Sequence, residues 1–339
     1  RDTDRSRGLG DVYKRQGYFD AGFGVGSSIV QGADPFVGLK RKDSDYWIGN
    51  FECVCSNVSD KKATFANQFR ISPICLSKIK HLDLYGVANN HVMQHGNDAY
   101  KEMLAYLEEN HISHIGSKRQ KKSVFTHQGK QIGILAFSQR PDNFTNDPLY
   151  WSLPEYSEIK NEIESLADCN YRIAYVHWGN EFIDFPYKDQ VQLAHYMIEC
   201  GIDLLIGMHP HRLQGYEIYK GKYIFYSLGN CVFNMKWEPT RYSIVVNVDF
   251  NSDQLVSYDY LYIGDNFFPR YIDNIPDEYD IEHLATLVNH SIENEKYYAE
   301  VFCNLKQYRK VNRVDFIKNV HNFKFKDFLN IISEFLRRK

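Results

Sequence analysis

The chain of 339 residues lacks several features that would place it in a common class of protein. It has no run of about 18 apolar residues and no apolar signal-peptide segment, so we expect no membrane span in this chain. It also has no Gly-x-x-x-x-Gly-Lys-Ser/Thr sequence to cradle the phosphates of ATP. The 40 Lys and Arg nearly balance the 43 Asp and Glu, which argues against nucleic acid as a partner.

The seven cysteines form no Cys-x-x-Cys pair and are odd in number. Cys53 and Cys55 are too close in sequence for an ordinary disulfide. Two interpretations remain for them, thiolate ligation of a metal or two small buried residues near a strand end, and we favour the second. Free cysteines suit a reducing compartment, so the composition favours a cytoplasmic location.

Polar side chains follow four short apolar runs at the point where each run ends. In an α/β sheet, the carboxyl ends of the strands are where ligands and metals collect. Neutral imidazole and carboxylate are common ligands of transition metals. The sequence therefore predicts a metal site at these ends. The residues concerned are Glu52 after the run from Trp47, Asn90 and His91 after Leu82 to Val87, His177 after Arg172 to Val176, and His209 and His211 after Asp203 to Ile206.

The sequence His209-Pro210-His211 places two imidazoles two residues apart. In an extended segment this spacing directs both side chains to one face. The proline stiffens the backbone between them. We expect an extended segment that presents both imidazoles together.

The order of these motifs resembles a known family. Over roughly residues 40 to 235, the chain is similar to the CapA family of capsule or poly-γ-glutamate synthesis proteins, which are related to calcineurin-like metallophosphoesterases. The resemblance implies an α/β fold, a four-layer α-β-β-α sandwich. It rests on Asn50-Phe51-Glu52-Cys53, Ala88-Asn89-Asn90-His91, His177-Trp178-Gly179, Gly207-Met208-His209-Pro210-His211 and Tyr226-Ser227-Leu228-Gly229-Asn230.

The resemblance also implies a role for each matching residue. Two divalent cations, with Mn, Fe, Zn and Mg all compatible, are implied as the cofactor. The implied metal ligands are Glu52, Asn90, His177, His209 and His211. His91 matches the histidine that assists the leaving group. Asn50, Glu181 and Asn230 are candidates to orient the metal ligands through hydrogen bonds.

Two positions depart from the family pattern. Met208 stands where the family usually has a further histidine. The family's first Gly-Asp motif has only two comparably weak counterparts here, Gly10-Asp11 and Asp20. Residues 1–16 are polar and charged throughout, and we interpret them as a non-native leader without a first strand.

The remaining pattern predicts a main domain over residues 17–264 and a helical C-terminal extension over 265–339. Residues Ser123–Thr126 and Gln131–Phe137 are typical of a hairpin, and Tyr187 to Cys200 of a helix. Within that helix His195 lies on an apolar stripe, which favours packing over metal ligation. We likewise favour a packing role for Trp178.

Two functional classes follow from these observations. The first is a metal-dependent hydrolase acting on a phosphoester or amide bond of an anionic polymer or its precursor in capsule biosynthesis. The second is a non-catalytic scaffold that binds polymer or capsule-assembly proteins. The histidine set favours the first and the uncertain first motif favours the second.

Overall fold

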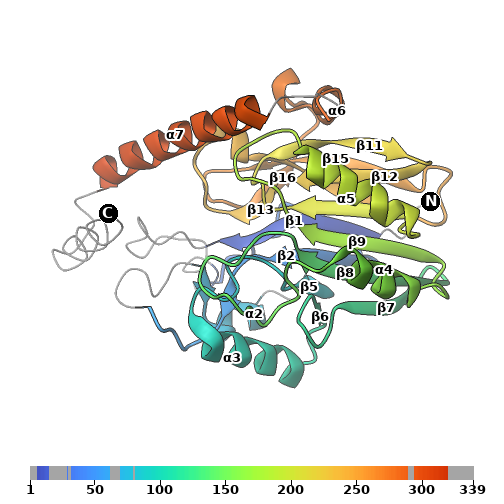
Figure 1. Ribbon diagram of the computed structural model, residues 1–339. Helices are drawn as coiled ribbons and strands as arrows, with labels where there is room; N and C mark the ends of the chain where they lie inside the picture. The colour runs from blue at the N-terminus through green and yellow to red at the C-terminus, as the bar shows by residue number, and fades with distance from the viewer. Residues whose placement is uncertain are drawn as a thin grey trace.

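The computed structural model describes residues 6–14, 29, 32–61, 69–78, 81–288 and 294–319. Its larger sheet has eight strands in the order β16-β15-β14-β1-β2-β5-β6, with β13 paired to β1 (Figure 1). A short pair, β3 (Val54–Cys55) and β4 (Arg70–Ile71), lies apart from it. The strands of the large sheet are β1 (Ser6–Lys14), β2 (Tyr46–Phe51), β5 (Leu84–Gly86), β6 (His114–Ile115), β13 (Asn230–Phe233), β14 (Tyr242–Val248), β15 (Val256–Ile263) and β16 (Pro269–Tyr271).

The second sheet has six strands in the order β11-β12-β10-β9-β8-β7. Strands β8, β9, β10 and β12 run parallel, while β7 and β11 are antiparallel edge strands. The predicted hairpin is confirmed, since β7 and β8 pair antiparallel. The strands are β7 (Lys122–His127), β8 (Lys130–Ser138), β9 (Tyr171–His177), β10 (Leu204–Met208), β11 (Leu213–Tyr219) and β12 (Lys222–Leu228).

The two sheets pack face to face through one apolar layer. Strand β8 shows why, because its side chains alternate between the two faces of the sheet. Ile132 and Ile134 lie in a core cluster with Ile48 of the large sheet. Leu135 and Phe137, on the opposite face, lie in a different cluster.

Helices cover the outer face of each sheet, which completes four layers (Figure 1). On the large sheet, α3 (Gly96–Glu109) packs Met103 and Leu107 in the cluster that holds Trp47. On the six-stranded sheet, α4 (Tyr156–Glu164) and α5 (Lys188–Glu199) pack against the outer cluster of β8. The α-β-β-α sandwich expected from the sequence is therefore confirmed. The other helical segments are α2 (Pro73–Lys78), η2 (Glu238–Thr240), η3 (Asp277–Tyr279), α6 (Ile281–Ala285) and α7 (Asn294–Asn319).

One expectation about the N-terminus is wrong. Residues Ser6–Lys14 form strand β1 in the middle of the large sheet, between β2 and β14. A strand between two others is held by backbone hydrogen bonds, which do not depend on an apolar run. Asp11 pairs in register with Asn50 and Asn230. The non-native origin of residues 1–16 stays a prediction, and Asp20 lies outside the described residues.

The C-terminal part is also not wholly helical. Pro269–Tyr271 adds strand β16 to the large sheet by pairing with β15. Helix α6 buries Ile281 and Leu284 in the cluster between the sheets. Helix α7 lies at the upper left of the molecule in Figure 1, and residues 320–339 lie outside the described chain. No helix among the described residues combines the length and apolar character needed to cross a bilayer.

Candidate metal centre

The predicted site residues gather at the carboxyl ends of strands from both sheets. Glu52 follows β2 and Asn90 follows β5, both from the large sheet. His177 ends β9, and His209 follows β10, both from the six-stranded sheet. Because the two sheets face each other, the side chains of Glu52 and Asn90 approach those of His177 and His209 from the opposite sheet.

Three of these side chains form a compact group. The ligand atoms of Glu52, His209 and His211 all lie within 4.8 Å of one another. Glu52 Oε1 is 3.7 Å from His211 Nε2, and all three residues are 0% exposed. A carboxylate and two imidazoles at this spacing are a donor set that suits a transition metal ion.

The backbone at the two histidines is unusual. His209 has φ 101° and His211 has φ 59°, so both lie in the left-handed region that non-glycine residues rarely adopt. The expectation of an extended His-Pro-His segment is therefore wrong. The segment bends sharply, and the imidazole centroids still approach to 5.9 Å. Such strained positions persist where the surrounding structure holds them, and they cluster at functional sites.

Asn230 orients the His211 ring. Its Nδ2 donates to the backbone oxygens of Thr240 (2.9 Å) and His211 (3.3 Å), which directs Oδ1 toward the ring. Oδ1 lies 3.0 Å from His211 Nδ1 and accepts its proton. The other ring nitrogen of His211, Nε2, then carries the lone pair and faces the Glu52 carboxylate. Asn230, a candidate supporting residue from the sequence, is 0% exposed.

His177 contacts both asparagines singled out in the sequence. Its Nε2 lies 2.8 Å from Asn90 Oδ1 and its Nδ1 lies 3.3 Å from Asn50 Nδ2. The His177 ring adjoins the group of three, since its centroid is 4.6 Å from that of His209. The structure thus arranges the predicted ligands as a group of three and a neighbouring pair, His177 with Asn90.

His91 lies at the edge of the group. Its Nε2 is 3.7 Å from Glu52 Oε1, and its Nδ1 is 2.9 Å from Gln94 Oε1. The Phe69 ring stacks on the imidazole at 3.4 Å. Phe69 on one face of the ring and Gln94 at Nδ1 hold the imidazole so that Nε2 points at the Glu52 carboxylate.

Burial keeps two of the imidazoles neutral. Burial lowers the pKa of His177 well below its ordinary value, and the positive charge of Arg140 lowers it further. Burial likewise lowers the pKa of His209, followed by the effects of His177 and Arg140. Neutral imidazole is the form that binds metal.

Two further residues at this site were not predicted from the sequence, Arg140 and Asn89. Arg140 follows β8, in a loop without a recognised motif, and acts electrostatically on both His177 and His209. Asn89 belongs to the Ala-Asn-Asn-His motif, and its Nδ2 donates to Phe51 O at 2.9 Å, which ties the loop after β5 to the end of β2. Asn89 could have been found because it lies within a recognised motif. Arg140 lies outside all of the motifs, so nothing in the sequence indicated its place at the site.

Other predicted roles have separate outcomes. Trp178 is a packing residue as expected, buried with Nε1 donating to Tyr226 O at 2.9 Å. His195 lies away from the site, with Nε2 2.7 Å from Glu217 Oε1. Glu181 is half-buried, and no hydrogen bond to an imidazole is found for it among the described residues. Cys53 and Cys55 are buried, and burial raises the pKa of both thiols, which disfavours thiolate ligation.

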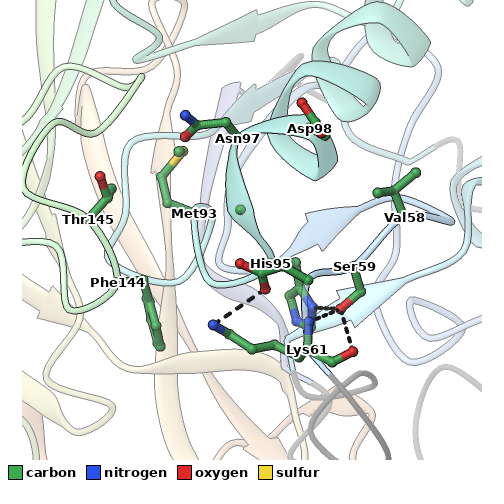
Figure 2. Close-up of a pocket in the computed structure, with 11 residues that line it drawn as sticks. Val58, Ser59, Lys61, Met93, His95, Asn97, Asp98, Phe144 and Thr145 are labelled. Carbon is green, nitrogen blue, oxygen red and sulfur yellow. Dashed lines mark hydrogen bonds and ion pairs between the residues drawn. The ribbon is translucent and has the colours of Figure 1, made fainter.

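A cavity of about 620 Å³ adjoins the centre at the start of α3 (Figure 2). The Phe144 ring lines this cavity and also lies 6.3 Å from the His91 ring. Figure 2 shows Ser59 bonded to His95, whose Nδ1 is 2.7 Å from Ser59 Oγ. Lys61 and Asp60 form an ion pair at 3.3 Å on the same wall.

The chain belongs to the family of bacterial capsule synthesis proteins, since the family model described as "Bacterial capsule synthesis protein PGA_cap" matches residues 10–235. The matched region contains every site residue named above. Met208, which precedes His209, is buried in the apolar cluster between the sheets.

Two relatives illustrate the extent of the similarity. The chain is 29% identical over 239 residues to the PGA biosynthesis protein CapA of Bacillus subtilis (strain 168), covering 65% of this chain and 60% of that protein. It is 28% identical over 226 residues to the capsule biosynthesis protein CapA of Bacillus anthracis, covering 60% of this chain and 54% of that protein. The matches therefore span 54% to 60% of the length of these relatives.

Two solved structures have a similar shape. One is a novel phosphatase from Mycoplasma pneumoniae, with a TM-score of 0.46 and 12% identity over 76% of this chain and 92% of that chain. The other is the 5'-nucleotidase of Candida albicans SC5314, with a TM-score of 0.46 and 11% identity over 91% of this chain and 58% of that chain.

Proposed function

We propose that this chain is a metal-dependent hydrolase that acts in capsule or poly-γ-glutamate biosynthesis, on a phosphoester or amide bond of an anionic polymer or its precursor. The observation that carries the proposal is the approach of the Glu52, His209 and His211 ligand atoms to within 4.8 Å of one another. Family membership supports the biological setting.

The residues fit a divalent cation on chemical grounds. The Glu52 carboxylate is 0% exposed, and burying a charge is costly unless an opposite charge offsets it. Burial favours the neutral form of His177 and His209, so these rings offer lone pairs rather than positive charge. A divalent cation would offset the carboxylate and accept those lone pairs.

Each residue has a role in this proposal. Glu52, His209 and His211 would hold one cation, and Asn90 with His177 would contribute to a second. Bound divalent cations supply Lewis acidity and activate a water molecule for attack. Asn230 and Asn50 hold the rings of His211 and His177 in orientation. His91, beside Glu52, donates a proton to the leaving group.

Metal content tests this function first. We expect about two equivalents of a transition metal per chain, as in two-metal hydrolases, measured by plasma mass spectrometry after purification. The double variant His209→Ala/His211→Ala should lose the metal, while His195→Ala, a histidine outside the site, should retain it. Metal-loaded protein is then assayed against phosphoesters and γ-glutamyl amides.

Each outcome has a definite meaning. Metal binding with hydrolysis of either bond type supports the hydrolase, and the preferred bond identifies the reaction class. Absence of metal in the wild type, even after reconstitution, would contradict it. The alternative would then be a scaffold that binds polymer or capsule-assembly proteins through the same fold.

A further inference from the structure

We propose that Arg140 and Asn180 form an oxyanion-binding subsite at the rim of the metal centre, which receives a carboxylate or phosphate group of the substrate. This inference rests on the proposed function and specifies one chemical feature of the substrate. It follows from the position of Arg140 beside His177 and from the hydrogen-bond partners of its guanidinium group.

The fold places Arg140 beside His177. Ser138, two residues earlier, pairs in register with His177 at the end of the parallel strands β8 and β9. The backbone N–H of Gln139 then donates to His177 O at 2.9 Å. The loop that carries Arg140 therefore begins at the same sheet edge as the metal centre.

Arg140 is half-buried, and no ion pair with an acidic residue is found for it among the described residues. Its Nη1 donates to Asn180 Oδ1 at 3.3 Å, and its Nε is buried without a hydrogen-bond partner among the described residues. Four other arginines of the described chain each have an aspartate oxygen within hydrogen-bond distance. They pair as Arg41 with Asp83, Arg172 with Asp203, Arg212 with Asp184, and Arg241 with Asp265.

Asn180 positions the guanidinium without neutralising it. Its Nδ2 donates to the hydroxyl oxygen of Tyr297 at 3.3 Å, so its amide oxygen faces Arg140. Tyr297 lies on α7 and is 2% exposed, and burial raises its pKa to about 12, so its hydroxyl stays protonated. A neutral amide holds the arginine in place and leaves its charge available.

An unneutralised arginine is unfavourable beside a site built for cations. Its charge would repel a cation held at His177, beside which the loop that carries Arg140 begins. An oxyanion between the two removes this conflict, because it pairs with the guanidinium and with the cation together. Arginine matches carboxylate and phosphate geometry through two parallel N–H bonds.

Calorimetric titration of the full chain tests the subsite without relying on turnover. The probes are inorganic phosphate and γ-linked diglutamate, each titrated into metal-loaded and metal-free protein. Arg140→Gln should weaken binding roughly tenfold or more, as expected for loss of a charge-assisted bond. Arg140→Lys, which keeps the charge without the planar fork, should have an intermediate effect.

Arg172→Gln is the matched control, because it removes the same charge at the opposite end of β9. It should leave both affinities unchanged. Arg140→Gln should also retain its metal or bind it more tightly, since a repelling charge is removed. A residue needed only for the fold would weaken metal and anion binding together, and thermal unfolding of each variant reveals that case.

The two proposals fail in different ways. If Arg140→Gln keeps its metal and binds both anions as the wild type does, the subsite is overturned and the hydrolase stands. If the wild type binds neither anion, the subsite is also overturned. If the wild type holds no metal, the hydrolase fails, and the metal-free titrations still decide the role of Arg140. A loss confined to phosphate or to diglutamate identifies the oxyanion.

Discussion

Asn230 shows how a single amide can orient the ring of a proposed metal ligand, His211. Two of its hydrogen bonds go to backbone oxygens, so the amide cannot turn without losing both. The His211 ring consequently keeps its proton on Nδ1 and its lone pair on Nε2. Partners of this kind commonly set the basicity and orientation of a ligating imidazole.

Asn230→Ala should weaken metal affinity roughly 10- to 100-fold, because His211 would lose the bond that orients it. Competition with a chelator of known affinity measures the change. Asn110→Ala, which alters an exposed asparagine at the end of α3, should leave the affinity unchanged. Equal affinities for Asn230→Ala and the wild type would show that His211 needs no support from Asn230.

At this scale the sequence was informative where a motif marked the end of a strand. Glu52, His177 and His209 were correctly predicted to lie at the ends of strands, because an apolar run followed by a polar residue can be recognised in the sequence alone. Arg140 was not found, since its role depends on the pairing of β8 with β9 across unrelated sequence. The bent backbone at His211 was also missed, because local spacing does not reveal a positive φ.

Helix α7 supports the loop that follows His177. Tyr308 stacks on Phe182 with ring centroids 4.4 Å apart, and Asn304 Nδ2 donates to Phe182 O at 2.8 Å. Phe182 has a φ of 69°, and its ring centroid lies 6.1 Å from that of His211. The helix therefore holds a strained residue next to a proposed ligand.

Tyr308→Ala should destabilise the protein by about 3 kcal/mol, typical of removing a buried aromatic ring, and should also weaken metal binding. Phe302→Ala removes an exposed aromatic side chain from the same helix and should change neither property. Chemical denaturation and chelator competition provide the two readouts. If Tyr308→Ala loses stability but keeps its metal affinity, α7 stabilises the fold without influencing the metal site.

The elements themselves were predicted unevenly. Strands β7 and β8 were recognised because each is a short run of apolar and β-branched residues on either side of a turn. Strand β1 was missed, since its polar sequence is held in the sheet by backbone pairing with β2 and β14. Strand β16 was missed because three residues are too few to show a period.

Across the whole molecule, the proposed ligands come from both sheets. Glu52 and Asn90 extend from the large sheet, while His177, His209 and His211 extend from the six-stranded sheet. A cation held by both sets joins the two halves of the sandwich. Metal binding should therefore stabilise the whole domain rather than one loop.

Removal of metal should lower the melting temperature. At a free ion concentration of about 100 times Kd, binding to the native state alone contributes about 2.7 kcal/mol. Differential scanning calorimetry with and without a chelator measures the difference. The His209→Ala/His211→Ala variant should melt at the same temperature under both conditions, and a wild type insensitive to the chelator would contradict a shared metal.

The order of the proposed ligands along the chain would also determine when a metal can be bound. Glu52 and Asn90 are synthesised well before His209 and His211, and they stand on a different sheet. Neither half provides the full donor set until β10 is complete and the sheets have docked. If these residues hold a cation, metal binding would follow the docking of the two sheets and would mark a correctly assembled domain.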